Sequence, residues 1–403
     1  MGRRIKLLLT FALLLPILSG CWDQQTIEDR ATILGIAIDQ VDPESVSRQE
    51  DVTHAQGDSP LREDQKPGIR LTAQIAVPGR LPLGAQETGG EKSPVWVVSV
   101  VAHTLDGAMA DLQQEIADEL FFGQLRVVVV SETVARNGLR DWGDYLRRNP
   151  EIRRTAWLAV SQGEAERLMR IAPPLERVPT LYLTGMLDRA VEMGKFPNMS
   201  EGRFWSYDSA KGRDPYLPYL QVEEGGNIKI KGLAIFRDAK MVGVTDPLQI
   251  GYFMGIMGLD PGGYSVLLPV PGGSDTAYYT FTAADRKARR KLTLKNGRPH
   301  ITLDLLIEGD VGEVVGQKLT QDVLRKMEKQ IATFAEDNYP QFIKQTQKQG
   351  SDIFAFGESV RGRLPGYWSD KVQTSEKWRE LYVDLPVELN VKIKIRRYGM
   401  KET

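Results

Sequence analysis

The sequence predicts an α+β fold divided among three domains, and three observations support that class. Apolar stretches of strand length alternate with helical patterns through the first half of the chain, which is typical of a mixed α/β domain. The last third combines a long amphipathic helix with strands of regular apolar and polar alternation, which favours an antiparallel sheet packed on that helix. The chain has 403 residues, enough for several hydrophobic cores.

Residues 21–200 are expected to form the mixed α/β N-terminal domain. Short apolar, β-branched runs predict its strands, at 33–39, 69–77, 95–102, 125–130 and 155–160. Thr104 is placed to cap a helix whose apolar stripe extends to Leu120. Two further helices are expected, at 136–148 and 163–171. A polar segment at 42–68 is expected to be a long exposed insertion, and a Gly/Pro-rich link at 78–94 is expected to join two of the strands.

A linker and a small middle α+β domain are expected over residues 201–273. Residues 173–219 are rich in Pro, Gly and single aromatics without clear periodicity, which favours a linker packed over its neighbour. The apolar runs at 228–236 and 241–244 flank a turn, so they predict a hairpin. Asp246 and Pro247 then open a short helix that ends near Met257.

The C-terminal domain is expected at 274–397, followed by a tail at 398–403. Strands are predicted at 278–283, 290–295 and 301–307, with Asn296-Gly297 as a tight hairpin turn. A long helix is predicted over 317–349. Residues 385–396 alternate apolar and polar side chains, which indicates a strand with one buried face and one wet face, as in an antiparallel sheet.

The N-terminus reads as a lipoprotein signal. Residues 1–6 carry three cations, an apolar stretch follows over 7–18, and Ser19-Gly20 precede Cys21, the sole cysteine. We therefore expect cleavage after residue 20 and a diacylglyceryl group on Cys21, with Trp22 at the membrane interface. A plain secretory signal is the alternative. The mature chain would be mildly acidic, at a net charge of about −4, which argues against a nucleic-acid partner.

Residues for catalysis, metal binding or a cofactor are not apparent in the sequence. The three histidines, His54, His103 and His300, have no carboxylate, serine or cysteine at the spacing of a triad or ligand set. The glycine-rich stretch 309–318 lacks the Gly-Lys-Ser/Thr ending of a phosphate loop. We expect neither an enzyme nor a metal or cofactor site.

One short motif stands out, at residues 351–358. Its candidate structural or interaction residues are Asp352, Phe354, Phe356, Gly357 and Glu358. The favoured interpretation is that Ser351 or Asp352 caps a following helix while the aromatic side chains fill the core beneath it. A direct contact with a partner is the other interpretation.

The chain resembles the Ger(x)C family, the lipoprotein subunit of bacterial spore germinant receptors. The resemblance starts at Cys21-Trp22-Asp23 and follows family order through blocks at 33–39, 120–130, 148–153, 232–236, 351–358 and 391–397. It implies a three-domain α+β lipoprotein on the outer face of the cell membrane, or of the spore inner membrane. It also implies two integral membrane partner subunits, one similar to permeases, and no catalytic activity.

Two other classes of function remain as alternatives. A solute-binding lipoprotein of a transporter would need two doubly wound lobes around a cleft, and the alternating C-terminal strands argue against that arrangement. A tethered enzyme such as a wall hydrolase would bring carboxylates or histidines together in a pocket. The leading prediction is a non-catalytic subunit of a nutrient receptor that triggers germination through protein contacts at the membrane.

Overall fold

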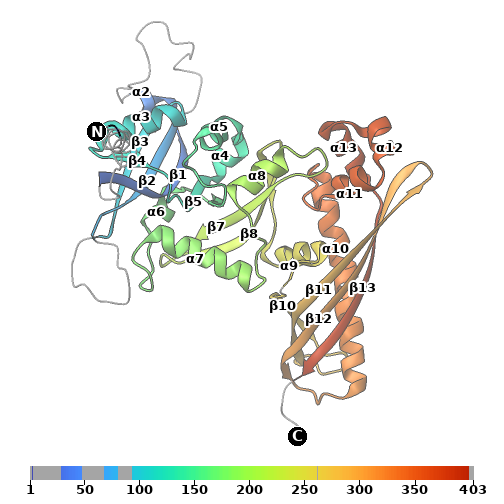
Figure 1. Cartoon of the computed structure of the whole chain (residues 1–403). Coiled ribbons are helices and arrows are strands. Elements are labelled where there is room, and N and C mark those ends of the chain that lie inside the picture. Colours follow the sequence, from blue (N-terminus) through green and yellow to red (C-terminus); the bar gives the residue numbers. More distant parts are fainter. Residues whose placement is uncertain (1, 3–28, 48–67, 80–92, 261, 399–403) are drawn as a thin grey trace.

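The computed structural model describes residue 2 and residues 29–47, 68–79, 93–260 and 262–398 (Figure 1). Cys21, Trp22, His54 and most of the segments 42–68 and 78–94 lie outside the described residues. The described chain forms two sheets, one of nine strands and one of four. Within the described residues, no helix is both long and apolar enough to cross a membrane.

The larger sheet has a parallel centre and antiparallel edges. Its strand order is β3-β2-β1-β5-β6-β7-β8-β9, and β4 pairs separately with the start of β1. The strands are β1 (Arg30–Val41), β2 (Gly68–Ala76), β3 (Val95–Ala102), β4 (Glu119–Phe121), β5 (Val127–Ser131), β6 (Trp157–Ser161), β7 (Tyr216–Val222), β8 (Ile228–Arg237) and β9 (Lys240–Val244). Strands β1, β5, β6 and β7 are parallel neighbours. Every residue of β5 and β6 is buried, as expected for parallel strands covered on both faces.

Seven helices accompany this sheet in the described part of the chain. They are α2 (Pro43–Ser47), α3 (Leu105–Glu115), α4 (Glu132–Asn137), α5 (Arg140–Arg148), α6 (Glu166–Arg170), α7 (Pro179–Glu192) and α8 (Glu201–Asp208). Thr104 caps α3 as predicted, because its side chain accepts a hydrogen bond from the Gly107 N–H. The helix predicted over 136–148 is instead divided, since Gly138 ends α4 with a φ of 119°.

The segment 173–219 is not an aperiodic linker. It contains α7 and α8, which bury Leu183, Leu187, Phe204 and Trp205. Local signals mark both starts: Pro179 stands in the first turn of α7, and Ser200 caps α8. Strands β7 to β9, within the residues expected to form the middle domain, extend the same sheet as β1, β5 and β6. The sequence-based boundaries of that domain stay a prediction.

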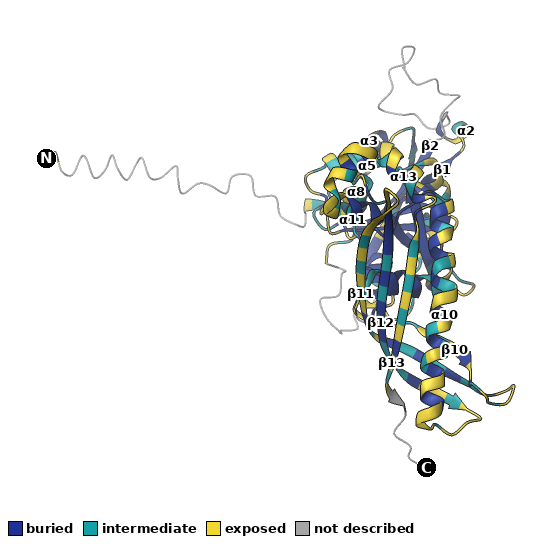
Figure 2. Cartoon of the chain, turned by 90° about the vertical axis from the view of Figure 1, so that its right-hand side faces the viewer, coloured by how far each residue is buried: buried dark blue, intermediate teal, exposed yellow. Residues whose placement is uncertain are grey.

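The smaller sheet has the order β10-β11-β12-β13 and packs against one long helix (Figure 2). Its strands are β10 (Ser265–Pro269), β11 (Tyr278–Lys295), β12 (Arg298–Val315) and β13 (Val387–Tyr398). The helices of this part are α9 (Pro247–Met257), α10 (Gln321–Lys348), α11 (Phe356–Arg363), α12 (Pro365–Tyr367), the π-helix η3 (Trp368–Val372) and α13 (Ser375–Tyr382). The α+β class, with an α/β N-terminal part and a sheet on a long helix, is confirmed.

The sheet itself is mixed rather than wholly antiparallel. Strand β13 pairs with β12 in the parallel direction, from Ile301 opposite Val387 to Val311 opposite Tyr398. Helix α10 provides the crossover that a parallel connection needs. Alternation did not reveal this, because a strand with one wet face alternates in the same way in either direction.

Two hairpins form at their predicted turns. Asn296 and Gly297 have φ values of 51° and 71°, so they form the tight turn between β11 and β12. Asp238 and Ala239, with φ of 52° and 54°, turn β8 into β9. The strands predicted separately at 278–283 and 290–295 are the two ends of β11, which a register shift at residues 283–285 interrupts without ending it.

Candidate functional site

The motif at 351–358 lies where the two sheets meet, between the end of α10 and the start of α11. Asp352 is fully buried. Its carboxylate accepts hydrogen bonds from the Phe356 N–H at 3.1 Å, the Gly357 N–H at 2.8 Å and the Trp378 Nε1–H at 3.0 Å. The side chain therefore caps α11 by accepting hydrogen bonds from N–H groups at the start of that helix, and it binds α13 through Trp378.

The backbone of Asp352 reaches across to the larger sheet. Its N–H donates to Asp214 Oδ2 at 2.9 Å, and its carbonyl accepts from the Asp214 N–H at 2.9 Å. Asp214 stands two residues before β7, so this reciprocal pair joins the entry to β7 with the loop after α10. We call Asp214, Asp238, Asp352, Trp378 and Arg379 the interdomain junction.

Arg379 forms ion pairs with two of the three carboxylates of this junction. Its Nη2 and Nε donate to Asp214 Oδ1 at 2.7 and 3.2 Å, and its Nη1 donates to Asp238 Oδ2 at 2.7 Å. Asp214 is 2% exposed, so a missing guanidinium would leave a buried charge without a partner. One arginine on α13 thus holds two acids of the larger sheet's strand ends.

Glycine makes the closest contact of the two parts possible. A Cβ on Gly212 would lie 2.4 Å from the Glu358 nitrogen and 2.4 Å from the Gly357 carbonyl carbon. In its absence the Gly212 N–H donates to Glu358 Oε1 at 2.9 Å, and the Glu358 N–H donates to the Gly212 carbonyl at 2.8 Å. Gly357 and Glu358 of the motif are therefore contact residues between the two parts of this chain.

Aromatic rings fill the space beneath the junction. Phe354 is fully buried and stacks on Phe253 of α9 and on Phe356, with ring centroids 5.9 and 5.4 Å apart, and meets the edge of Phe342 of α10 at 5.5 Å. Such pairs add about 1 kcal/mol each beyond their buried area. The motif's aromatic side chains thus anchor α9, α10 and α11 to one another.

Burial sets the protonation of the junction. Desolvation raises the pKa of Asp352 to about 6, against the opposing effect of its hydrogen bonds to the α11 backbone and to Trp378. Desolvation also raises the pKa of Asp214, against the charge of Arg379. The arrangement has no nucleophile beside a base. What it does chemically is hold two sheets in one orientation.

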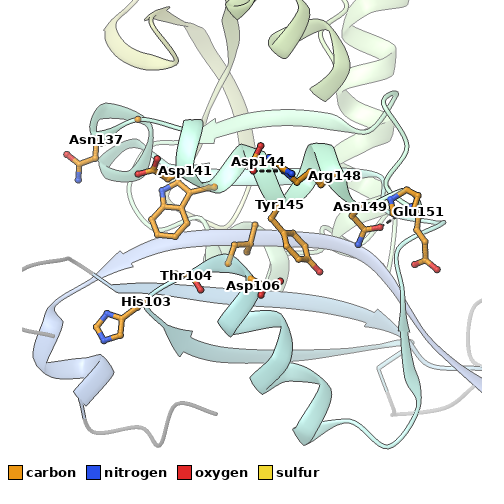
Figure 3. Close-up of a pocket in the computed structure, with 14 residues that line it drawn as sticks. His103, Thr104, Asp106, Asn137, Asp141, Asp144, Tyr145, Arg148, Asn149 and Glu151 are labelled. Carbon is orange, nitrogen blue, oxygen red and sulfur yellow. Dashed lines mark hydrogen bonds and ion pairs between the residues drawn. The ribbon is translucent and has the colours of Figure 1, made fainter. Parts of the chain in front are cut away.

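A surface cleft of about 930 Å³ lies elsewhere, between the start of α3 and helix α5 (Figure 3). Its walls carry Asp106, Asp141, Asp144 and Glu151, and one cation, Arg148, donates from Nε to Asp144 Oδ2 at 2.6 Å. Desolvation, together with the charges of Asp106 and Glu151, raises the pKa of the lining residue Tyr145, which stays a neutral phenol. The cleft has the size and the charge to accept a small cationic group.

Metal ligation has little support in the part of the chain that the structure describes. No group of three or more His, Cys, Asp or Glu side chains there is placed to hold a metal ion. His103 lines the cleft, while His300 pairs through Nε2 with Glu388 Oε1 at 3.0 Å.

Comparison with known proteins places both halves in one family. Residues 23–222 match the family model described as "Spore germination protein N-terminal domain". Residues 231–399 match "Spore germination B3/ GerAC like, C-terminal". The chain belongs to the Ger(x)C family. This confirms the resemblance seen in the sequence.

Relatives of this Ger(x)C chain match along almost its full length. Spore germination protein KC of Bacillus subtilis is 25% identical, with 100% of this chain and 97% of that protein covered. Spore germination protein GerQC of Bacillus cereus is 22% identical, over 82% of this chain and 90% of that protein. A crystal structure of the GerBC protein shares the fold, with a TM-score of 0.54 and 20% identity over 81% of this chain and 93% of the other.

The structure brings together all the motif residues of this Ger(x)C chain that the sequence singled out, from Asp352 to Glu358. It adds residues that sequence reasoning missed, namely Gly212, Asp214, Trp378 and Arg379. Arg379 and Asp214 are 165 positions apart, so no local pattern links them. Whether the motif also touches a partner protein stays a prediction, as does the lipidation of Cys21.

Proposed function

We propose that this chain is the lipid-anchored, non-catalytic subunit of a nutrient receptor that triggers spore germination. The observation that carries the proposal is the pair of family matches, at residues 23–222 and 231–399, the first of which begins two residues after Cys21. The relatives named above are called spore germination proteins. The signal-like residues 1–20 and the position of Cys21 support an anchor of two acyl chains at the membrane surface.

The proposed mechanism rests on confinement and rigidity. Lipid at Cys21 restricts the folded body to the plane of the membrane, which raises its effective concentration beside integral membrane partners without further contacts. The junction of Asp214, Asp352 and Arg379 then keeps the two sheets in a fixed relative orientation. A contact made by one part is therefore transmitted to the other as a rigid-body displacement.

The partners of this subunit are proposed to be two integral membrane proteins, one of them permease-like, in the spore inner membrane. The test is tagged co-purification from detergent-solubilised spore membranes, with the wild-type chain and Cys21→Ala compared side by side. We expect two membrane proteins in constant proportion with the wild type and at least tenfold less with Cys21→Ala.

A membrane-bound wild-type chain that purifies alone would refute the receptor role while leaving the anchor intact. Purification with the subunits of a transporter would favour the solute-binding alternative. Mass spectrometry of the mature N-terminal peptide tests the anchor independently, because a diacylglyceryl group adds a mass that Cys21→Ala cannot carry.

A further inference from the structure

The hairpin of β11 and β12 concentrates positive charge at one end of the smaller sheet. Residues 286–303 contain seven Lys and Arg residues and no Asp or Glu. Two of these cations face inward: Arg286 is 2% exposed, and Arg290 lies over the Phe356 ring at 5.1 Å. The other five are exposed, namely Lys287, Arg289, Lys291, Lys295 and Arg298.

The acids around the hairpin do not neutralise all of these cations. Asp304 pairs with Lys291 at 2.7 Å, and Glu388 pairs with Lys295 at 3.4 Å. Two further acids of these strands, Asp285 and Glu308, both pair with Arg396, while Asp310 and Glu313 lie farther from the turn on β12.

Three cations are left over. Lys287, Arg289 and Arg298 are exposed and form no ion pair within 4 Å of a described acid. Hydrogen bonds from Arg396 and Lys291 lower the pKa of Asp285 and of Asp304, respectively, and the nearby charges of Lys287 and Arg289 lower these two pKa values further. Lys287 and Arg289 alternate along one face of β11, so their side chains emerge about 7 Å apart on the same side of the sheet. Arg363 of α11 is a fourth exposed cation. It lies beside the hairpin, because its Nη1 donates a hydrogen bond to the carbonyl of Arg290 at 2.7 Å.

An apolar side chain accompanies this charge. Leu294, two residues before the Asn296-Gly297 turn, is 48% exposed. These basic side chains extend from the middle of β11 to the turn, with the exposed leucine near the turn. The combination matches the chemistry of a bilayer surface, where cations meet anionic headgroups and an apolar side chain enters the boundary of the acyl chains. We call Lys287, Arg289, Leu294 and Arg298 the basic tip.

We propose that the basic tip docks on anionic lipid headgroups as a second membrane contact. In Figure 1 the tip and the start of β1 lie on opposite sides of the molecule. Nine residue steps separate Cys21 from Arg30, so the lipid lies within about 30 Å of the start of β1. A single tether at that end leaves the body free to swing, whereas a contact at the far sheet orients both sheets along the membrane.

This inference rests on the proposed attachment at Cys21 for its setting, but its test does not need the lipid. The mature chain carrying Cys21→Ala is mixed with vesicles of phosphatidylcholine containing 30% phosphatidylglycerol, and binding is measured by co-sedimentation at 50 mM salt. We expect binding to these vesicles and none to pure phosphatidylcholine. Raising the salt to 500 mM should release the protein, since exposed charges are then screened.

The variant Lys287→Ala/Arg289→Ala/Arg298→Ala removes the unpaired cations. Each cation near an anionic surface strengthens binding about fivefold, so the triple variant should bind about 100-fold more weakly. A second variant, Leu294→Ser, should weaken binding while leaving its salt dependence unchanged. Circular dichroism and thermal melting confirm that both variants fold, because every changed side chain is exposed.

The matched control removes three exposed cations from the opposite end of the same domain, in Lys318→Ala/Arg325→Ala/Lys329→Ala. It should bind like the parent chain. Equal binding by the hairpin variant and the parent chain would overturn the proposal, and so would equal losses in the hairpin and control variants. A hairpin variant that binds vesicles normally but no longer co-purifies with membrane proteins would assign the basic tip to an acidic protein surface instead.

Discussion

The buried carboxylate of Asp352 makes a definite prediction about stability and pH. In Asp352→Asn the side chain keeps one acceptor oxygen, so at least one of the three donors at Phe356, Gly357 and Trp378 loses its partner. One buried donor without a partner costs about 1–3 kcal/mol. Against this, the amide removes a buried carboxylate. Burial raises the pKa of Asp352 from 3.8 to about 6, so keeping this carboxylate ionised in the fold costs the wild type about 3 kcal/mol at neutral pH, and the variant avoids that cost.

The sign of the pH dependence follows from the raised pKa. A carboxyl group with a higher pKa in the folded state stabilises the fold when it is protonated, and this stabilisation is lost as the pH rises through the folded pKa. Lowering the pH from 7.5 to 5 should therefore stabilise the wild type by about 1.4 kcal/mol through Asp352 alone. Asp352→Asn lacks this gain, so between pH 7.5 and pH 5 the free energy of unfolding of the wild type should rise by about 1.4 kcal/mol relative to that of the variant.

Urea unfolding of the mature, unlipidated chain, followed by tryptophan fluorescence, measures this difference at both pH values. Asp370→Asn is the matched control, because Asp370 is exposed on η3 close to the junction in sequence. The control should track the wild type at both pH values. If the free energy of unfolding of the wild type does not rise relative to that of Asp352→Asn between pH 7.5 and pH 5, the assignment of a raised pKa to Asp352 is wrong.

Three further changes test the packing of the junction and the N-terminal part, each by urea unfolding. Gly212→Ala should destabilise the fold by more than about 2 kcal/mol, because the added Cβ would lie 2.4 Å from backbone atoms. Gly185→Ala, on the exposed side of α7 with nothing within 4 Å of the added Cβ, should instead stabilise the fold by about 0.5–1 kcal/mol. Arg379→Ala should lower the free energy of unfolding by about 3 kcal/mol, because Asp214 is left buried and charged. The double variant Arg379→Ala/Asp214→Asn should recover part of that loss, and no recovery would contradict the ion-pair account. Asp39→Ala should cost about 1–2 kcal/mol, since its carboxylate accepts from two N–H groups at the start of α6, and an unchanged midpoint would show that this cap is dispensable.

Local chemistry made some of the structure predictable. Thr104 before an apolar stripe, and Asn296-Gly297 between alternating strands, each specify a cap or a turn through their own side chains and backbone preferences. The capping role of Asp352 was also open to prediction, because a carboxylate before a helix has few other uses in a core.

Interactions between distant segments were not predictable in the same way. The pairing of Arg379 with Asp214 depends on how α13 folds back over the entry to β7, and the side chains themselves look like ordinary surface charges in the sequence. The direction of β13 was hidden for a related reason, since alternation reports which face is buried and not which way the neighbour runs. Helices α7 and α8 were missed because their proline and aromatic residues resemble a linker.

The parallel pairing of β12 with β13 has a consequence for how the protein is made. Ile301 pairs with Val387, which lies 86 positions later, so the smaller sheet is completed only when the last strand has been synthesised. Until then β12 presents an unpaired edge to its surroundings, which is a template for association with other chains. A stop codon at Val387, the first residue of β13, should therefore yield a protein that aggregates, although the whole of the larger sheet is already in place.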